Sequence, residues 1–420
     1  MKSSYAKTFA FTLLTLSLAA CAPMSQRPGA DTAAATTTTA EYRPVILVSI
    51  DGFKPDYLNR GVTPRLNAMA ASGVRAETMR PSFPSITFPN HYTLVTGLRP
   101  DHHGIVGNNM EDSKIPGVRF RLGNSSAVLD RRWWDEAEPV WVTAEKNNVR
   151  SAIMFWPGSE AAIHGVRPSE YRPFDGKLSP ADRVDTMLAW LDKPASSRPQ
   201  FLTLYFDQVD HAGHEFGPDT PEVTEAVASA DVAIARLMEG LRTRHLDANV
   251  IIVSDHGMAA TSPERTVQLD KIVNPALYTV VTYGSYAGID PKPGQEEAVA
   301  KDLLKTHEHM QCWKKENIPA RYEYGQNPRV PRFICLPEVS WLVMPDAAAA
   351  AKAGKGAHGY DNQSKEMQAL FIANGPAFKK GAVLPTFDNV SVYPLIMKLI
   401  HVPALPSDGK LESVQGALAQ

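Results

Sequence analysis

Three apolar runs, each ending at acidic residues, constrain the fold of this 420-residue chain most strongly. The runs and the residues after them are Val45–Ile50 before Asp51, Phe201–Phe206 before Asp207 and Asp210, and Val250–Ser254 before Asp255 and His256. Continuous apolar runs of this length, separated by helical patterns, are typical of strands buried on both faces of a parallel sheet. The sequence therefore predicts an α/β fold with a mostly parallel central sheet flanked by helices. We expect helices near residues 62–73, 88–97, 138–147, 179–192, 220–243 and 390–400.

The polar residues that follow these strands predict a metal site. In open α/β sheets, ligands bind outside the carboxyl ends of the strands. The candidate ligands at that edge are Asp51, Asp210, His214, Asp255, His256 and His358. Mixed imidazole and carboxylate ligands suit zinc better than magnesium or calcium. Six ligands are too many for one tetrahedral ion but fit two, so we expect two Zn²⁺ with positions left open for a hydroxyl and a substrate.

Thr87 is the candidate nucleophile. It stands just before Pro89 and a helical run that closes at Gly97, and Pro is favoured in the first turn of a helix. A side chain at that point faces unpaired N–H groups and the positive end of the helix dipole, where phosphate binds. A nearby metal would lower the pKa of the hydroxyl. The alternative is that Thr87 only caps the helix.

The N-terminus predicts export. Residues 1–20 carry Lys2 and Lys7 before a short apolar core, as in a secretory signal. The signal ends at Cys21 in a sequence that resembles a bacterial lipobox, which implies lipid on that cysteine and, with Ala22 next, the periplasmic face of the outer membrane. Residues 21–42, rich in Ala and Thr, predict a flexible tether. The alternative is a plain signal peptide, an incidental cysteine and a periplasmic protein.

Composition changes again between residues 262 and 350, where prolines punctuate short strand patterns. We interpret this stretch as a smaller inserted α+β subdomain, and residues 43–261 and 351–410 as the catalytic core. Cys312 and Cys335 lie inside it and are expected to form a disulfide in an oxidising compartment. Their spacing excludes a structural zinc finger.

The charge balance limits the class of partner. The formal net charge is −2 and the pI is about 6.6, so no bulk electrostatic field favours a nucleic-acid polymer or an anionic membrane. We expect small-molecule substrates, contact with a membrane only through the N-terminal lipid, and no obligate protein partner.

Several segments between residues 43 and 405 resemble the nucleotide pyrophosphatase/phosphodiesterase family of the alkaline phosphatase superfamily. The segments are Asp51–Gly52, Thr87–His91, Val209–His214, Ser254–Met258 and His358–Asn362. The lipobox-like leader indicates a bacterial member. The resemblance implies an alkaline phosphatase-like core that hydrolyses phosphodiester or pyrophosphate bonds of nucleotides and releases nucleoside 5′-monophosphates.

The resemblance also implies roles for single residues. Asp51, Thr87, Asp255 and His256 would hold one zinc, and Asp210, His214 and His358 the other. Thr87 would attack phosphorus and form a nucleotidyl-threonine intermediate, while the amide of Asn108 donates to a phosphoryl oxygen. Phe88 and Tyr205 match an aromatic pair that stacks on a nucleobase, with Tyr171 as a third candidate. Four further histidines are interpreted as structural or as supporting the site: His91, His102, His103 and His211.

Other functions remain open on the same residues. A phospholipase C-like or lysophospholipid phosphodiesterase would use the same metal core with a different pocket, and a phosphomonoesterase is a further possibility. A sulfatase is disfavoured because Thr87–His91 does not match its Cys- or Ser-led motif. A non-catalytic binding lipoprotein is the remaining alternative.

Overall fold

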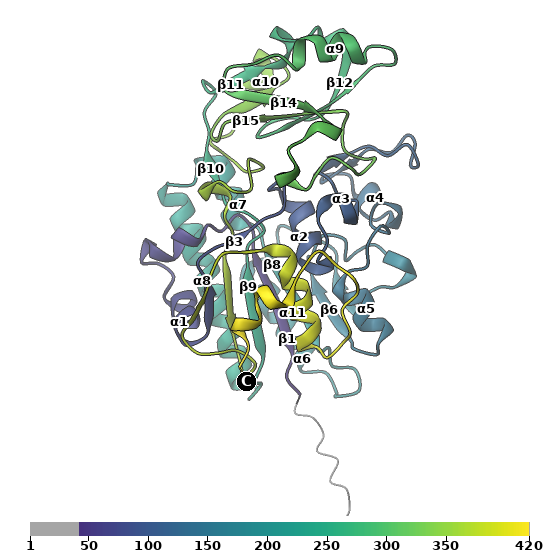
Figure 1. Ribbon diagram of the computed structural model, residues 1–420. Coiled ribbons are helices and arrows are strands. Elements are labelled where there is room, and N and C mark those ends of the chain that lie inside the picture. The colour runs from purple at the N-terminus through teal and green to yellow at the C-terminus, as the bar shows by residue number, and fades with distance from the viewer. Residues whose placement is uncertain (1–41, 420) are drawn as a thin grey trace, which may run out of the picture. The chain divides into compact units, whose positions relative to one another are not determined.

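The centre of the molecule is an eight-stranded sheet with the order β19-β2-β18-β9-β1-β8-β6-β7. The computed structural model describes residues 42–419. The strands of the sheet are β1 (Val45–Ile50), β2 (Val74–Ala76), β6 (Ser151–Met154), β7 (Glu170–Arg172), β8 (Phe201–Phe206), β9 (Asn249–Val253), β18 (Phe371–Asn374) and β19 (Ala382–Leu384). Strands β9, β1, β8, β6 and β7 are parallel, whereas β18 is antiparallel to both of its neighbours. The predicted mixed α/β fold with a mostly parallel central sheet is confirmed (Figure 1).

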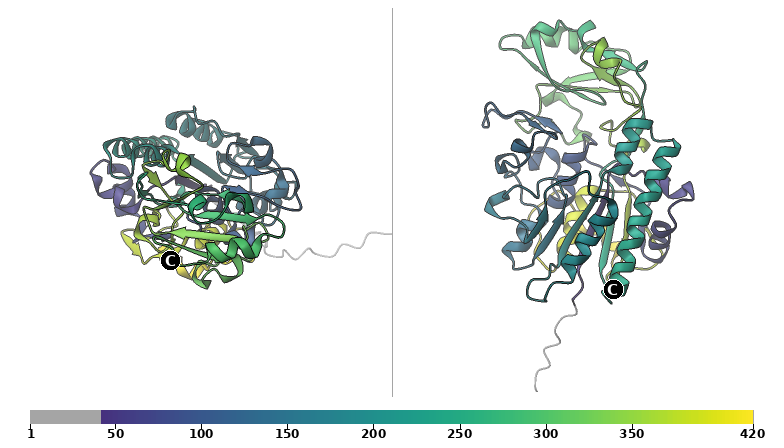
Figure 2. Two further views of the ribbon diagram at one scale, coloured as in Figure 1. Left: turned by 90° about the horizontal axis from the view of Figure 1, so that it is seen from above. Right: turned by 180° about the vertical axis from the view of Figure 1, so that it is seen from behind.

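Helices cover both faces of this sheet because alternate side chains of β1 point to opposite sides. Ile46 and Val48 pack in one apolar cluster with α1 (Pro64–Ser72), α6 (Pro180–Leu191) and α8 (Pro221–Thr243). Val45 and Leu47 pack in another with α2 (Thr87–Thr96), α5 (Val140–Lys146) and α11 (Val392–Leu399). The view from behind shows the long helix α8 lying along the sheet (Figure 2).

A second, antiparallel sheet lies between α8 and the return of the chain to the core. It has the order β12-β13-β15-β14. Its strands are β12 (Tyr278–Thr282), β13 (Ala287–Pro291), β14 (Met310–Lys314) and β15 (Phe333–Pro337), with α9 (Glu296–Leu303) packed in the same apolar cluster. Cys312 and Cys335 face each other on β14 and β15 and form a disulfide. The boundaries 262 and 350 of the proposed subdomain stay a prediction.

Short elements complete the described chain. The paired strands are β3 (Met79–Arg80) with β20 (Phe387–Asp388), β4 (Asn109–Met110) with β5 (Phe120–Arg121), β10 (Ala259–Ala260) with β17 (Gly356–Ala357), and β11 (Thr266–Gln268) with β16 (Leu342–Met344). The remaining helices are α3 (Pro100–His103), α4 (Ser125–Val128), α7 (Gln208–Phe216) and α10 (Ala347–Ala350).

The N-terminal predictions are not tested by the structure. The signal peptide 1–20, Cys21 and the tether up to residue 41 lie outside the described residues. Within residues 42–419, no helix has the length and apolar character needed to cross a bilayer.

His103 joins α3 to α2 in a fully buried contact. Its Nε2 lies 3.1 Å from the carbonyl of Pro89 and 3.0 Å from Thr93 Oγ1, while its Nδ1 accepts from the Ile105 N–H at 3.1 Å. A proton on Nδ1 would oppose that N–H, and burial disfavours the charged ring. Burial accordingly lowers the pKa of His103 to about 3.

We expect His103 to make the fold acid-sensitive. The unfolded chain takes up a proton near the ordinary pKa of 6.5 and the folded chain does so only near 3, so stability falls as pH drops through that window and is unaffected by this group above it. His103→Gln should therefore flatten the decline of the unfolding free energy between pH 7 and 5 by about 2 kcal/mol. Urea denaturation at both pH values measures this. His102→Gln, which removes the exposed neighbouring histidine, is the control for the loss of any histidine here. A decline as steep in His103→Gln as in the parent would contradict the argument.

Candidate active site and metal centre

The strand register brings the predicted acidic residues to one edge of the sheet. Ile50 pairs with Phe206 and Ser49 with Val253, so β1, β8 and β9 end at nearly the same level. Asp51 then turns away at Gly52, which has a φ of +69° and lies so close to α7 that a Cβ there would be 3.0 Å from Asp210 Cα. A larger residue would be strained and would push the two carboxylates apart.

The first group of donor atoms surrounds His256. Its Nε2 lies 2.8 Å from Asp255 Oδ2, 3.3 Å from Thr87 Oγ1 and 3.5 Å from Asp51 Oδ1. Ligands around a tetrahedral ion with bonds of about 2.0 Å are about 3.3 Å apart, so these distances suit one metal. Both Asp51 Oδ1 and Asp255 Oδ2 are buried. Among residues 42–419, the first has no hydrogen-bond partner, and the second has only the imidazole nitrogens of His256 and His91 nearby, in poor hydrogen-bond geometry. Such oxygens are costly unless a cation binds them.

The second group surrounds Asp210. Its carboxylate oxygens lie 3.4 Å from Nε2 of His214 and 3.4 Å from Nε2 of His358, and these two nitrogens are 3.0 Å apart. The other ring nitrogens face backbone carbonyls, Gly356 for His214 and Ser85 for His358. Such outer contacts orient metal-binding imidazoles, and here they aim both Nε2 atoms at Asp210.

The two groups are contiguous. The rings of His256 and His358 stack with centroids 3.5 Å apart. Donor atoms that lie within 4.8 Å of one another form the sets Asp210, His256, His358 and Asp51, His91, Asp255. By the distances of its Nε2, His256 could belong to either set of donor atoms. The division of the ligands between two ions therefore stays a prediction.

His91 reaches this cluster although we interpreted it as structural or supporting. Its Nδ1 lies 3.4 Å from Asp255 Oδ2 and 2.9 Å from the carbonyl of Thr87, and its Nε2 is 2.8 Å from Ser49 Oγ. Because both nitrogens have partners within the protein, the ring supports Asp255 rather than offering it a free nitrogen. Its place one helical turn after Thr87 is the sequence signal for this proximity. The side chains of His102 and His211 lie on the surface, beside Asp408 and Glu215.

The charges of the cluster shift its pKa values. Burial, together with the carboxylates of Asp255 and Asp210, raises the pKa of Asp51 well above its ordinary value. Burial acts in the same direction on Asp255, but the adjacent His256 and His91 hold the pKa of that carboxyl well below its usual range. Burial and the neighbouring imidazoles lower the pKa of His358. The raised pKa of Asp51 shows that this buried carboxyl has too little positive charge around it, and a divalent cation would supply that charge.

Thr87 begins α2 instead of preceding it. Ile86 occupies the cap position, and the helix starts at Thr87. The expectation of a helical run from residue 88 was therefore one residue late. Asn108 Oδ1 accepts from the Phe88 N–H at 3.0 Å, so the Asn108 amide lies at the same helix end as Thr87. This contact fixes the amide plane and leaves its NH₂ end as the donor.

A cavity of about 320 Å³ lies beside Phe88, the residue that follows Thr87. Phe88 and Tyr205 both line it, as do Phe155 and Phe174. The Tyr205 hydroxyl donates to Asp51 Oδ2 at 2.6 Å, so one wall of the cavity is directly bonded to the carboxylate–imidazole cluster. Tyr171 is not among the lining residues; its ring lies beside the guanidinium of Arg167. Phe174, which we did not predict, follows β7 and occupies the wall in its place; no sequence pattern distinguishes the two aromatics.

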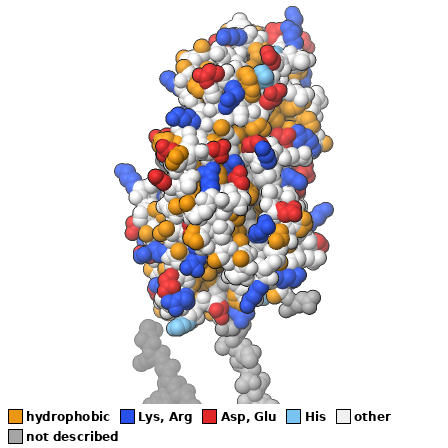
Figure 3. Space-filling model, turned by 90° about the vertical axis from the view of Figure 1, so that its left-hand side faces the viewer, with side chains coloured by type: hydrophobic (Ala, Val, Ile, Leu, Met, Phe, Trp, Pro, Cys, Tyr) orange, Lys and Arg blue, Asp and Glu red, His pale blue; other side chains and the backbone are white. Residues whose placement is uncertain are grey.

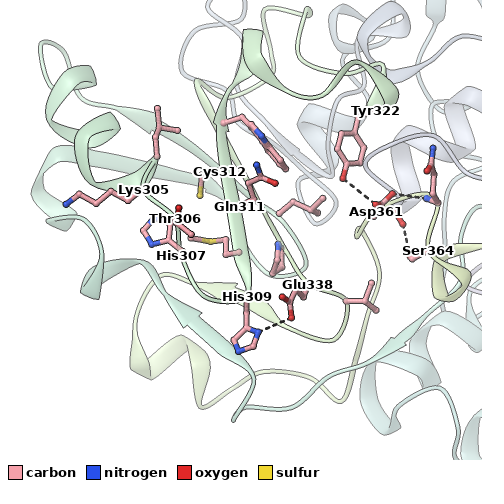
Figure 4. A pocket seen from close by; sticks show the side chains of 17 residues that line it. Lys305, Thr306, His307, His309, Gln311, Cys312, Tyr322, Glu338, Asp361 and Ser364 are labelled. Atoms are coloured by element: carbon pink, nitrogen blue, oxygen red, sulfur yellow. Dashed lines mark hydrogen bonds and ion pairs between the residues drawn. The ribbon is translucent and has the colours of Figure 1, made fainter.

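A larger cavity, of about 760 Å³, lies along β14 and the loop at Asp361 (Figure 4). None of the predicted metal, catalytic or substrate-binding residues within 42–419 lines it. Although this cavity is the larger of the two, it is therefore not the candidate active site.

Comparisons with known proteins agree with this geometry. A model of the family "Type I phosphodiesterase / nucleotide pyrophosphatase" matches residues 45–361. An uncharacterised pyrophosphatase/phosphodiesterase of Schizosaccharomyces pombe is 40% identical over 88% of this chain and 79% of its own length. A bis(5′-adenosyl)-triphosphatase of Xenopus laevis is 36% identical over 89% of this chain and 81% of its own length.

Other relatives are much longer. Rat ectonucleotide pyrophosphatase/phosphodiesterase family member 3 is 34% identical over 89% of this chain, but the match spans only 44% of that protein. Among solved structures, an inactive threonine-to-alanine variant of murine ectonucleotide pyrophosphatase/phosphodiesterase 5 in complex with AMP superposes with a TM-score of 0.86 at 33% identity, over 90% of this chain and all of that one. These relatives are eukaryotic, so they give no support to the bacterial origin that we predicted.

Proposed function

Because the chain belongs to the type I phosphodiesterase/nucleotide pyrophosphatase family, we propose that it hydrolyses nucleotide phosphodiester or pyrophosphate bonds at a di-zinc centre and releases nucleoside 5′-monophosphates. The observation that carries the proposal is the joint placement of Thr87, the carboxylate–imidazole cluster and the cavity lined by Phe88 and Tyr205. The inactivating threonine-to-alanine change in the murine relative supports a threonine as the nucleophile.

The donor atoms fit zinc. Asp51, Thr87, Asp255 and His256 would hold one ion, and Asp210, His214 and His358 the other. Nitrogen and carboxylate donors at these spacings match zinc coordination, and the orphaned carboxylate oxygens need a cation. When bound, the ions would lower the pKa of the Thr87 hydroxyl and offset the charge of the phosphate.

The reaction would proceed in two displacements. Thr87 Oγ1 forms a bond to phosphorus as the bond to the leaving oxygen breaks, which gives a nucleotidyl-threonine. Water then attacks the same phosphorus, releases the nucleoside monophosphate and restores the hydroxyl. The N-terminus of α2 stabilises negative charge beside Thr87, and the Asn108 NH₂ donates to a phosphoryl oxygen as charge develops there.

The walls of the cavity favour a nucleobase. Aromatic rings stack on any base, and the cavity is lined by Phe88, which follows Thr87 on α2, and by Tyr205 on β8. The Phe174 ring contacts that of Tyr205 edge-on, with centroids 6.2 Å apart, which extends the aromatic surface. AMP in the murine relative is consistent with such a ligand.

A lipid-headgroup phosphodiesterase is the second candidate. Three apolar side chains that line the cavity are about half exposed, Leu122, Leu129 and Phe174. Such a rim could contact an acyl chain. The two candidates differ in whether binding depends on the aromatic walls or on the exposed rim.

We further propose that the chain is a bacterial lipoprotein, held in the periplasm by lipid on Cys21. The pattern of the leader supports this anchor. Separately, a side view shows acidic and basic side chains interspersed, and not the basic surface that would suit a nucleic-acid polymer (Figure 3). Labelled palmitate should be incorporated into the full chain and not into Cys21→Ala; equal labelling would contradict the anchor.

Loss of the nucleophile should abolish diester hydrolysis. Zinc-loaded protein should cleave bis-p-nitrophenyl phosphate faster than p-nitrophenyl phosphate, and Thr87→Ala should lower kcat by about 10³-fold or more, because no other group forms the covalent intermediate. Removal of zinc by a chelator should have a similar effect, reversed by adding zinc back.

Thr87→Ser is the matched control and should keep measurable activity, since it retains a hydroxyl. Full activity of Thr87→Ala would overturn the nucleophile assignment. Faster hydrolysis of the monoester would indicate a phosphatase.

Substitution of Phe88 should separate the two substrate classes. A nucleoside 5′-(p-nitrophenyl phosphate) gains stacking that methyl p-nitrophenyl phosphate lacks, so Phe88→Leu should lower kcat/KM for the first by about 5- to 100-fold and leave the second nearly unchanged. Leu122→Ser is the comparison for the rim. If Leu122→Ser impairs turnover while Phe88→Leu does not, and a lysophospholipid is the better substrate, the protein is a lipid-headgroup phosphodiesterase and not a nucleotide phosphodiesterase.

A further inference from the structure

Tyr324 and Arg329, far along the chain, hold the loop that carries Asn108. The Tyr324 hydroxyl donates to the carbonyl of Val106 at 2.9 Å, and Arg329 Nη1 donates to the carbonyl of Gly104 at 2.8 Å. Both side chains come from residues that are 5% exposed. The backbone just before Asn108 is therefore fixed at two points by the same distant segment.

Arg329 also fixes the other end of this loop. Its Nε donates to Asp112 Oδ2 at 2.7 Å, and the carbonyl of Trp133 accepts from Nη1 at 2.7 Å. Glu136 lies 3.1 Å from Nη2. A planar guanidinium with five fixed donors can make these contacts at once, which an ammonium cannot. The span from Gly104 to Asp112, with Asn108 in its middle, is thus pinned on both sides.

Gly104 allows this close packing. It has a φ of +79°, and a Cβ there would come within 2.5 Å of Glu136 Oε2 and 2.8 Å of Arg329 Nη1. Asn327 adds a contact from the same segment, with its Nδ2 donating to Glu136 Oε2 at 2.8 Å. Arg329 is therefore the buried end of this network, which reaches the surface at Glu136.

The second sheet and its loops also touch other parts of the site. Ser285 donates to the carbonyl of His358. Tyr322 donates to Asp361, in the loop after His358, at 3.4 Å (Figure 4). Phe83, four residues before Thr87, packs against the rings of Tyr322 and Tyr324. This region thus contacts the Thr87 loop, the Asn108 loop and the His358 loop.

We propose that Arg329 and Tyr324 are positioning residues that keep the Asn108 amide aimed at the phosphoryl oxygen, so that the 262–350 region completes the active site. The inference rests on the proposed function for the role of Asn108. Hydrogen-bond donors stabilise a transition state only when they are already in place, and small displacements from distant changes lower the rate strongly. The Phe88 N–H holds only the oxygen of the Asn108 amide, so the direction of its NH₂ also depends on the loop that carries the Asn108 backbone.

We call the contacts of Arg329 and Tyr324 with residues 104–112 the clamp. Two mild variants test it in the full chain with zinc bound. Arg329→Lys keeps the charge but loses the fork, and Tyr324→Phe removes a single hydroxyl. We expect kcat for bis-p-nitrophenyl phosphate to fall about 10- to 100-fold in the first and about 3- to 10-fold in the second. KM and zinc content should stay within about 2-fold, because the carboxylate–imidazole cluster is not touched.

Arg332→Lys is the matched control. Arg332 also forms several ion pairs, but its partners are Glu296 and Glu316. The same conservative change at this position should leave kcat near that of the parent. An equal loss at Arg329 and Arg332 would show that general loosening, and not the clamp, lowers activity.

Combination with Asn108→Ala gives the decisive comparison. If Arg329 acts through Asn108, then Asn108→Ala/Arg329→Lys should be no slower than Asn108→Ala alone. Multiplication of the two losses would overturn the proposal, as would unchanged kcat in Arg329→Lys.

Amide hydrogen exchange separates failure of the clamp from failure of the proposed function. Peptides covering residues 104–112 should exchange faster in Arg329→Lys and Tyr324→Phe, and not in Arg332→Lys. If the parent hydrolyses no phosphodiester, the proposed function fails while exchange still decides whether the clamp exists. Unchanged exchange in both variants would remove the clamp whatever the activity.

Discussion

The structure depends most on the crowding of three carboxylates beside a group of imidazoles at one edge of the sheet. Asp51 and Asp255 are almost completely buried, and Asp210 is separated from Asp51 only by the turn at Gly52. Burial, together with repulsion from the carboxylates of Asp255 and Asp210, raises the pKa of Asp51. A buried group of this kind destabilises the protein unless a cation binds, so the rest of the fold must hold it in place.

The apolar strands supply that rigidity, and the same strands made the site predictable. Every residue of β1 and β9 is buried, so their positions are set by packing on both faces, and the residue after each strand has little freedom. Asp51 and Asp255 could therefore be placed together from the sequence. The strands β2, β7 and β19 were not predicted because each is three residues long and depends on neighbours for its pairing. The antiparallel direction of β18 depends on how the chain re-enters the core after the second sheet. The sequence of the strand itself does not indicate this direction.

Residues that reach the site through space were harder to find than residues that follow strands. Arg329 lies between prolines in a stretch that indicates turns, and nothing near it signals a contact with Gly104, more than 200 residues away. Phe174 and Tyr171 are three residues apart and chemically alike, so only the path of the chain after β7 decides which one lines the cavity. Motifs record the groups that react, whereas the groups that position them are recorded only in the tertiary structure.

The proposed role of the Asn108 amide as a donor to the phosphoryl oxygen gives its positioning particular weight. A charged side chain attracts a phosphoryl oxygen from several directions, and its energy falls off slowly with distance. An amide offers only a dipole, which falls off faster and depends on angle, so a small rotation removes most of its benefit. A diester carries less negative charge than a monoester and needs less neutralisation, which permits a neutral donor. The proposed neutral donor would require a rigid loop, and in our proposal the guanidinium of Arg329, bound to Gly104, Asp112 and Trp133, supplies that rigidity.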